Sequence, residues 1–241
     1  MKNNFFHRVV FVRQISALCI LCVFFGCTPV YVPNTLNTHV PTNINEVYIS
    51  GHSLQNDLDF ATSYAVTDNI ALQFNGSISK VNTEKQNNYH KHDFFEGGLV
   101  ASEIIKRKTF VSGNLSYGSG KVSSFYNFSA INNDTTLSDA EFNRVSAQLN
   151  FGYKAKNGEI IGSTRFSYVQ FNTIYVPATT LQILHLKYGS LFVEPALTIK
   201  YGIPYIKFVI QTGALFSVKK NIPFSYQKYF VSLGTEIAIT K

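Results

Sequence analysis

The chain has 241 residues and a formal net charge of +7, and its charged residues make up 15% of the total, against about 25% in typical soluble domains. Aromatic residues reach 15%, Trp is absent, and three Cys allow at most one disulfide bond. This composition excludes a coiled coil, a disordered chain and a disulfide scaffold, and it argues against a soluble enzyme of ordinary composition.

The N-terminus reads as an export signal over residues 1–26. A basic start precedes an apolar run of eleven residues, 15–25, which is followed by Gly26 and Cys27. A transmembrane helix needs about 20 apolar residues, so this run is too short to span stably. Residues 24–27, Phe-Phe-Gly-Cys, resemble a bacterial lipobox, and this resemblance implies cleavage before Cys27 and acylation of that Cys. The alternative is an ordinary cleavage site with an incidental Cys.

Residues 27–45 are rich in Thr, Asn, Pro and Val, without a hydrophobic period. Such a segment is typical of a flexible tether, here between a lipidated Cys27 and the folded part. Residues 1–26 hold three of the 21 Lys and Arg, which leaves 18 bases against 14 acids. With no basic run longer than residues 106–108, nucleic-acid binding is not expected.

From Glu46 to the C-terminus the pattern is period-two alternation, which indicates strands with two different faces. In the last strand Tyr229, Leu233 and Ile237 share the apolar face. Several segments match the 9–11 residues that cross a bilayer at a tilt. The alternation predicts ten strands, with eight as the alternative count, at residues 46–52, 58–66, 70–80, 93–105, 109–119, 141–155, 160–171, 187–202, 205–218 and 224–240.

The connections alternate in length. Short turns are expected at residues 66–69, 106–108, 156–159 and 202–205, and long loops at 81–92, 120–140 and 172–186. Short turns on one side and long loops on the other are the layout of an outer-membrane barrel. We therefore expect extracellular long loops, both termini on the periplasmic side, and a lipid anchor at Cys27 in the inner leaflet.

The polar face distinguishes a membrane barrel from a soluble one. It holds mainly Ser, Asn, Gln, Thr, Gly and Ala, and small residues suit a narrow lumen. A Lys or Arg facing lipid at mid-membrane would cost about 2–4 kcal/mol, so the isolated charges should point inward and pair. The expected lumen charges are Glu96, Arg144, Arg165, Glu194, Lys200, Lys207 and Glu236.

The C-terminal residues resemble the barrel-assembly signal of Gram-negative outer-membrane proteins, with Ser232, Gly234, Ile237 and Ile239 at its positions. Residues 24–27, Phe-Phe-Gly-Cys, resemble a lipobox, and residues 192–196 are similar to a segment of small lipidated barrels of Bacteroidota. The resemblance implies an antiparallel up-and-down barrel over residues 46–241, recognised by the outer-membrane insertion machinery. Such barrels have no generally assigned role.

Motifs for chemistry are sparse. The sequence holds no P-loop, GxGxxG, CxxC, HExxH or GxSxG. His90, His92 and Asp93 have the residue types of a metal site, but a solvated loop end is the simpler interpretation, so neither metal nor cofactor is expected. Asp57 and Asp59 near His52 have the paired-acid spacing of an outer-membrane protease, and His185 could serve a lipid-facing deacylase. No accompanying motif supports either.

The sequence thus predicts a monomeric, non-catalytic outer-membrane lipoprotein with a structural or surface-interaction role. Its expected partners are membrane lipid, the insertion machinery and an extracellular molecule that the loops contact. The alternatives are a soluble lipid-anchored barrel with an apolar ligand inside, an outer-membrane enzyme and a narrow channel. Aromatic residues expected in or beside the loops are Tyr89, Phe125, Tyr126, Phe128 and Tyr175.

Overall fold

The computed structural model describes residues 29–54, 57–83, 88–106, 108–127, 135–177, 183–185, 187–220, 222 and 224–239. The predicted signal at 1–26 and the predicted lipidation site Cys27 lie outside these residues. Within the described ranges, no helix has the length and hydropathy to cross a membrane.

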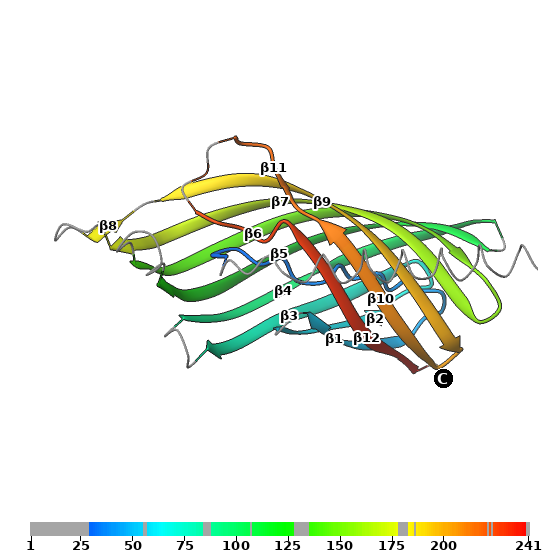
Figure 1. The fold of residues 1–241 in the computed structure, drawn as a ribbon. Helices are drawn as coiled ribbons and strands as arrows, with labels where there is room; N and C mark the ends of the chain where they lie inside the picture. The colour runs from blue at the N-terminus through cyan, green and yellow to red at the C-terminus, as the bar shows by residue number, and fades with distance from the viewer. Residues whose placement is uncertain are drawn as a thin grey trace, which may run out of the picture.

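Among the described residues, ten strands form the closed wall of a barrel, whose strands are drawn as arrows in Figure 1. They are β1 (Val47–Leu54), β2 (Asp57–Ala65), β3 (Ile70–Thr83), β4 (Asn88–Lys106), β5 (Thr109–Asn127), β6 (Thr135–Lys154), β7 (Gly158–Pro177), β9 (Tyr188–Ile203), β10 (Ile206–Ala214) and β12 (Tyr229–Ile239). Two short strands, β8 (Ile183–His185) and β11 (Phe216–Ser217), pair with β7 and β9 respectively.

The sheet closes on itself. Neighbouring strands of the wall are antiparallel, and β9 follows β7 directly in the ring. The seam pairs β1 with β12, from Val47 opposite Ile239 to Leu54 opposite Ser232. Because lipid cannot hydrogen-bond a free edge, closure is what a membrane requires. The predicted all-β, antiparallel fold is confirmed, with ten strands in the ring rather than eight.

Strand ends differ from the predicted ones on one side of the barrel. β4 begins at Asn88, β5 runs to Asn127, β6 begins at Thr135 and β7 ends at Pro177. Most of the residues predicted as long loops therefore extend the strands, because ladder hydrogen bonds satisfy the backbone of adjacent strands whatever their side chains. Of the aromatic residues expected there, Tyr89, Phe125, Tyr126 and Tyr175 lie in strands, and Phe128 lies outside the described residues.

The opposite correction applies near the C-terminus. β10 ends at Ala214 and β12 begins at Tyr229, so residues 224–228 are not strand. Leu215, between β10 and β11, keeps the inward direction of Val209 and Gln211 and is 1% exposed. The part of the wall formed by β10 and β12 is consequently short, whereas the part formed by β4–β7 is tall.

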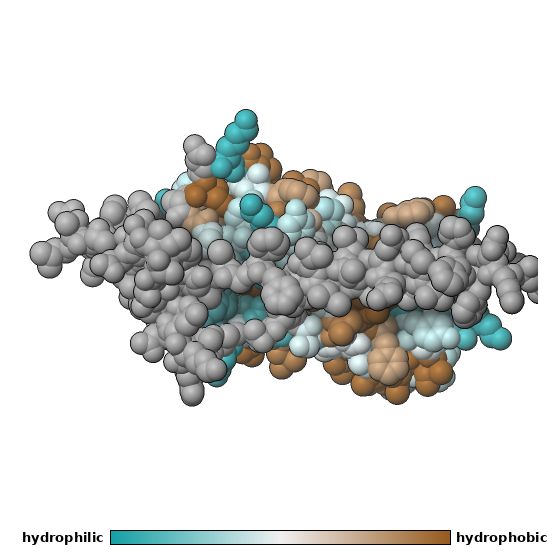
Figure 2. All heavy atoms as spheres, viewed as in Figure 1, coloured by the Kyte–Doolittle hydropathy of each residue, from teal (hydrophilic) through white to brown (hydrophobic). Residues whose placement is uncertain are grey.

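Apolar side chains face outward. Leu149, Phe208 and Leu233 are 61%, 69% and 61% exposed, and Figure 2 shows brown apolar atoms over the wall where grey atoms leave it in view. The inward positions of the same strands are polar, as with Gln148 and Ser232. This arrangement is the inverse of a soluble barrel and has the polarity of a membrane barrel.

Candidate functional site: a polar lumen closed by the N-terminal segment

The lumen is filled by the chain's own N-terminal segment. Residues 30–41 are buried, except for the half-buried Val32, and the blue trace in Figure 1 runs inside the barrel. We name residues 29–46 the plug. The sequence predicted a free tether over 27–45. In the structure residues 30–41 of this segment lie within the barrel, because the lumen offers partners for their backbone and amide groups.

The plug runs from the end of the barrel that carries the long connections, which we call the loop end, to the end that carries the short turns, which we call the turn end. At the loop end, the Val30 amide donates to the Ser225 carbonyl at 2.9 Å, and the Gln227 amide donates to the Tyr31 carbonyl at 3.0 Å. At the other end, the Ile44 amide donates to Asp68 Oδ1 at 2.8 Å, in the short turn after β2. Asn45 then adopts a left-handed conformation, with φ of 66°, which turns the chain into β1.

The middle of the lumen holds two ion pairs joined by Asn34. Arg144 Nη2 donates to Glu96 Oε2 at 2.7 Å, and Arg165 Nε donates to Glu194 Oε2 at 2.8 Å. Both guanidinium groups donate to Asn34 Oδ1, at 2.7 and 3.0 Å. Asn34 Nδ2 donates in turn to Glu96 Oε1 at 3.3 Å. Charges this deeply buried need such partners to offset their lost hydration.

Side-chain amides of the wall hold the next plug residues. Gln211 accepts from the Leu36 amide at 2.7 Å and donates to the Leu36 carbonyl at 3.0 Å, as a neighbouring strand would. Gln148 Nε2 donates to the Asn37 carbonyl at 2.7 Å, and Asn37 Nδ2 donates to Asn75 Oδ1 at 2.9 Å. A buried extended segment needs these bonds because unpaired backbone groups are costly.

A second group of charges lies nearer the turn end. Lys200 Nζ contacts Glu236 Oε2 at 2.5 Å and donates to the Thr38 carbonyl at 3.1 Å. His39 Nε2 lies 3.1 Å from the same carboxylate oxygen. The plug is therefore tied to wall charges at two levels, once through Asn34 and once through Thr38 and His39.

Glu46 fastens the plug at the turn end. Its Oε2 accepts from the Thr42 and Asn43 amides at 3.0 and 3.1 Å, and its Oε1 accepts from Asn43 Nδ2 at 2.8 Å. Burial raises the pKa of Glu46, but the hydrogen bonds from Asn43 and Thr42 outweigh it and hold the pKa below its usual range. The ionised carboxylate thus closes this small loop.

An apolar cluster seals the loop end around Tyr31. The Tyr31 ring stacks on Phe192 at a centroid distance of 5.1 Å and meets Phe142 edge-on at 5.9 Å. A Cβ atom at Gly120 would come within 2.9 Å of the Phe142 ring, so glycine makes room for it. The cluster consists of Val30, Tyr31, Phe94, Val122, Ala140, Phe142, Val169, Phe171, Phe192, Leu215 and Phe224.

The structure places all seven expected charges inside the barrel. Six are at most 3% exposed, and Lys207 pairs with Glu159 at 2.7 Å nearer the turns. Glu159 is a lumen residue that the sequence analysis assigned to a turn. The plug contacts were missed as well. A signal for them exists, since residues 29–45 contain no Asp, Glu, Lys or Arg, whereas a solvated tether usually carries charges.

The assembly-signal residues divide between the two faces of β12. Ser232 faces the lumen and is fully buried, whereas Ile237 and Ile239 face outward and are 43% and 53% exposed. Gly234 lies opposite His52 of β1 at the seam.

The candidate metal residues separate. Asp93 faces outward and is exposed, whereas His90 and His92 are buried in the lumen. Among the described residues, no three His, Cys, Asp or Glu side chains are grouped as metal ligands. The two rings instead hydrogen-bond each other at 2.8 Å, and His92 Nε2 lies 2.8 Å from Ser77 Oγ.

The candidate protease residues also lie within the lumen rather than at an open rim. Asp57, Asp59 and His52 are 8%, 0% and 6% exposed. Asp59 Oδ2 accepts from the Thr35 amide of the plug at 2.6 Å. His185 lies in β8, where it is paired with Tyr175 near the end of β7.

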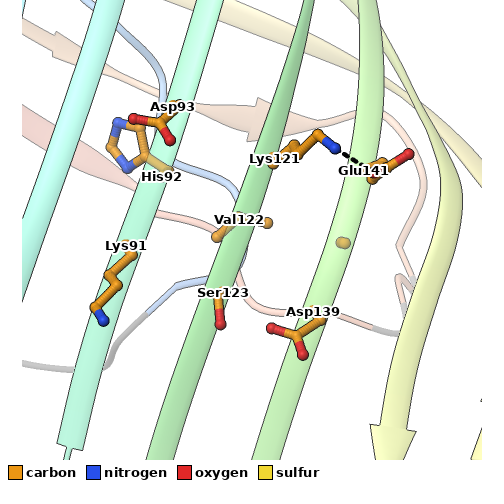
Figure 3. A pocket seen from close by; sticks show the side chains of 9 residues that line it. Lys91, His92, Asp93, Lys121, Val122, Ser123, Asp139 and Glu141 are labelled. Atoms are coloured by element: carbon orange, nitrogen blue, oxygen red, sulfur yellow. Dashed lines mark ion pairs between the residues drawn. The ribbon is translucent and has the colours of Figure 1, made fainter.

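A hollow of about 380 Å³ lies against the tall wall (Figure 3). Its exposed side chains alternate with buried ones on β4, β5 and β6, and Lys121 pairs there with Glu141 at 2.7 Å. Its lining residues are Lys91, His92, Asp93, Lys121, Val122, Ser123, Asp139, Ala140 and Glu141. The outward positions here are charged, so this part of the wall projects beyond the apolar belt.

No protein-family model matches the sequence, and no curated protein matches it. Among solved structures, the chain is similar to the translocator domain of the autotransporter NalP from Neisseria meningitidis, with a TM-score of 0.50 and 10% identity over 98% of this chain and 96% of that chain. A second match is the outer-membrane protease OmpT from Escherichia coli, with a TM-score of 0.49 and 8% identity over 80% of this chain and 93% of that chain. At 10% identity the likeness to the NalP translocator domain concerns the fold alone, and the fold is that of an outer-membrane β-barrel.

Proposed function

We propose that the protein is a non-catalytic outer-membrane lipoprotein with a structural or surface-interaction role, and that its barrel is closed by its own plug. The observation that carries the proposal is the occupied lumen. Plug backbone at Leu36, Asn37 and Thr38 is hydrogen-bonded to wall side chains, and the apolar cluster around Tyr31 closes the loop end.

The outer belt supports the membrane location. β12 has 11 residues, which at about 3.3 Å per residue and a tilt of about 40° span about 25 Å. Its outward residues Tyr229, Val231 and Leu233 are 67%, 51% and 61% exposed. An apolar band of this height matches the hydrocarbon layer.

The narrow-channel alternative makes the opposite prediction about the lumen. Because the plug and its partners fill the passage, we expect the purified full-length protein to give no steady ion current in planar bilayers. A variant that lacks residues 30–41 should conduct if it folds, since polar side chains would then line an open lumen. A steady current from the full-length protein would contradict the closed barrel.

The surface role rests on the tall wall. Strands β4–β7 have 19 or 20 residues each, about twice the length that a bilayer requires. The projecting part carries the charged hollow with exposed Lys91 and Lys121. Cells that carry either Lys91→Glu or Lys121→Glu as a single substitution should lose adhesion or partner binding. Cells that carry Lys108→Glu, at a short turn, should not. Equal binding by all three strains would contradict the role of this surface.

One observation favours an enzyme as the second candidate. Ser77 Oγ and His92 Nε2 are 2.8 Å apart, and His90 Nε2 lies 2.8 Å from His92 Nδ1. This arrangement has the geometry of a nucleophile, its base and a third group that orients the base. Ser77 is 1% exposed, so a substrate has no access to its hydroxyl in this structure. We therefore expect a fluorophosphonate probe to leave the intact protein unlabelled. Labelling that Ser77→Ala abolishes would support the enzyme instead.

A further inference from the structure

The direction of the plug decides on which side of the barrel the preceding chain emerges. Val30 and Tyr31 are bonded to residues 225–227 at the loop end, while Ile44 is bonded to Asp68 at the turn end. Residues between them are buried in the lumen. We infer that the chain before Pro29 leaves through the loop-side mouth, and that acyl chains on Cys27 insert into the outer leaflet at the cell surface.

The inference rests on the proposed function in two respects, namely that Cys27 is acylated and that the loop end faces outside. It reverses the expected location of the anchor in the inner leaflet. The barrel termini do lie on the turn side, because β1 begins beside the turn at residues 66–69 and β12 ends there. The plug, however, carries the chain back across the membrane before β1 begins.

Chain length excludes the inner leaflet. Three residues lead from Val30 back to Cys27, and an extended chain covers at most about 3.3–3.6 Å per residue, so the reach is about 10 Å. The hydrocarbon layer is about 25–30 Å thick. From the position of Val30 at the loop end, Cys27 therefore cannot return to the turn side, either through the filled lumen or around the outside.

The short wall brings lipid close to this exit. Ser225, the partner of Val30, lies four residues before Tyr229, where β12 begins opposite Ala214. The outward residues Phe216, Val218 and Tyr229 on this side are 53%, 60% and 67% exposed. The apolar belt thus reaches the level at which the plug leaves the barrel, and an acyl chain on Cys27 has hydrocarbon within its reach.

Thiol labelling of intact cells tests the inference. Three single substitutions provide the probe positions. Thr28→Cys lies directly before the plug, Lys219→Cys lies on the loop side and Thr67→Cys lies on the turn side. An impermeant maleimide is applied to intact cells and then to cells with a permeabilised outer membrane. The unsubstituted chain shows whether Cys27 itself has a free thiol, since Cys19 and Cys22 belong to the predicted signal.

We expect Thr28→Cys to label on intact cells together with Lys219→Cys, and Thr67→Cys to label only after permeabilisation. Labelling of position 28 together with position 67 would overturn the inference whatever the orientation of the barrel. Labelling of positions 28 and 219 only after permeabilisation would confirm the common exit but refute the proposed orientation. Labelling of the unsubstituted chain would refute acylation of Cys27. The exit side would then be tested with the same three substitutions on a Cys27→Ser background. Position 28 would be compared there with position 67 on the turn side and position 219 on the loop side.

Discussion

Two ion pairs of the same length lie in opposite environments. In the lumen, Arg144 and Glu96 are 2.7 Å apart, with side chains 1% and 2% exposed, and on the projecting tall wall Lys121 and Glu141 are also 2.7 Å apart, with side chains 76% and 57% exposed. The Arg144 guanidinium additionally lies 4.3 Å from the centroid of the Phe94 ring. Distance therefore does not separate these pairs, but burial does.

The difference teaches where polar contacts control this barrel. Water screens an exposed pair, so its formation changes stability little. A buried charge that loses its partner stays without water or counter-charge, and the loss is large. We expect the lumen contacts, rather than the surface pairs, to hold the plug and to set the stability of the closed state.

The largest effect should follow from Arg144→Met, which breaks the lumen pair. It leaves the Glu96 carboxylate buried without its cation, which typically costs about 3–5 kcal/mol. Urea unfolding in detergent micelles, followed by the heat-dependent mobility of the barrel on gels, measures the loss. The double variant with Glu96→Gln should recover part of it, because no buried charge then remains. Equal urea midpoints for Arg144→Met and the wild type would contradict the importance of this pair.

A smaller effect is expected for Asn34→Ala, which removes the plug's link between the two arginines. Unsatisfied donors buried in this way cost about 1–3 kcal/mol. Proteolysis of the plug and the urea midpoint should both report the change. Asn157→Ala is the matched control, because Asn157 is exposed in the short turn between β6 and β7 and lies outside the plug. If both variants are equally protease-sensitive, Asn34 does not fasten the plug.

An intermediate case is Glu46, which lies at the mouth with a lowered pKa. A carboxylate of this kind stabilises the folded state at pH values above its ordinary pKa of about 4.5, and this contribution disappears as the pH falls through the lowered folded value. Glu46→Gln should therefore have a lower urea midpoint than the wild type at pH 7. The difference should shrink in strong acid. A difference that is the same at both pH values would mean that ionisation of Glu46 is irrelevant.

The smallest effect is expected for Lys121→Ala, which breaks the exposed pair. The urea midpoint should stay within experimental error of the wild type, because both side chains are solvated. Glu141→Ala is the companion variant and should behave in the same way. A loss comparable to that of Arg144→Met would refute the distinction between the two environments.

Much of the wall followed from alternation alone. Positions such as Leu149 and Phe208 face outward as predicted, and each of the ten wall strands overlaps one of the predicted ranges. Loop boundaries were less accurate, because β4–β7 continue as strands where their outward residues become polar. In these parts the alternation is reversed: inward positions such as Val122 and Ala140 are apolar and buried, whereas outward positions such as Lys121 and Glu141 are charged. The pattern of apolar residues facing outward therefore no longer marks the strand, and pairing with neighbours decides how far each strand extends.

For the candidate site, the sequence indicated the inward charges of the wall but not the plug residues that contact them. Inward charges such as Arg165 and Glu194 could be identified because a charge facing lipid is costly. Their partner Asn34 could not be identified, since it belongs to a segment without a hydrophobic period. Glu159 could not be identified as a lumen residue because it was expected in a turn. Ser77, His90 and His92 are brought together by the register of β3 and β4.

The sequence by itself determined the barrel: alternating faces, strand count, and the sign and type of the residues that must avoid lipid. Only the tertiary structure decided that residues 29–46 occupy the lumen, and hence on which side the chain before them emerges. The physical reason is that alternation is a local property of each strand. Occupancy of the lumen depends instead on whether ten distant strands together present enough hydrogen-bond partners to replace the water around a segment that has no Asp, Glu, Lys or Arg from residue 29 to residue 45.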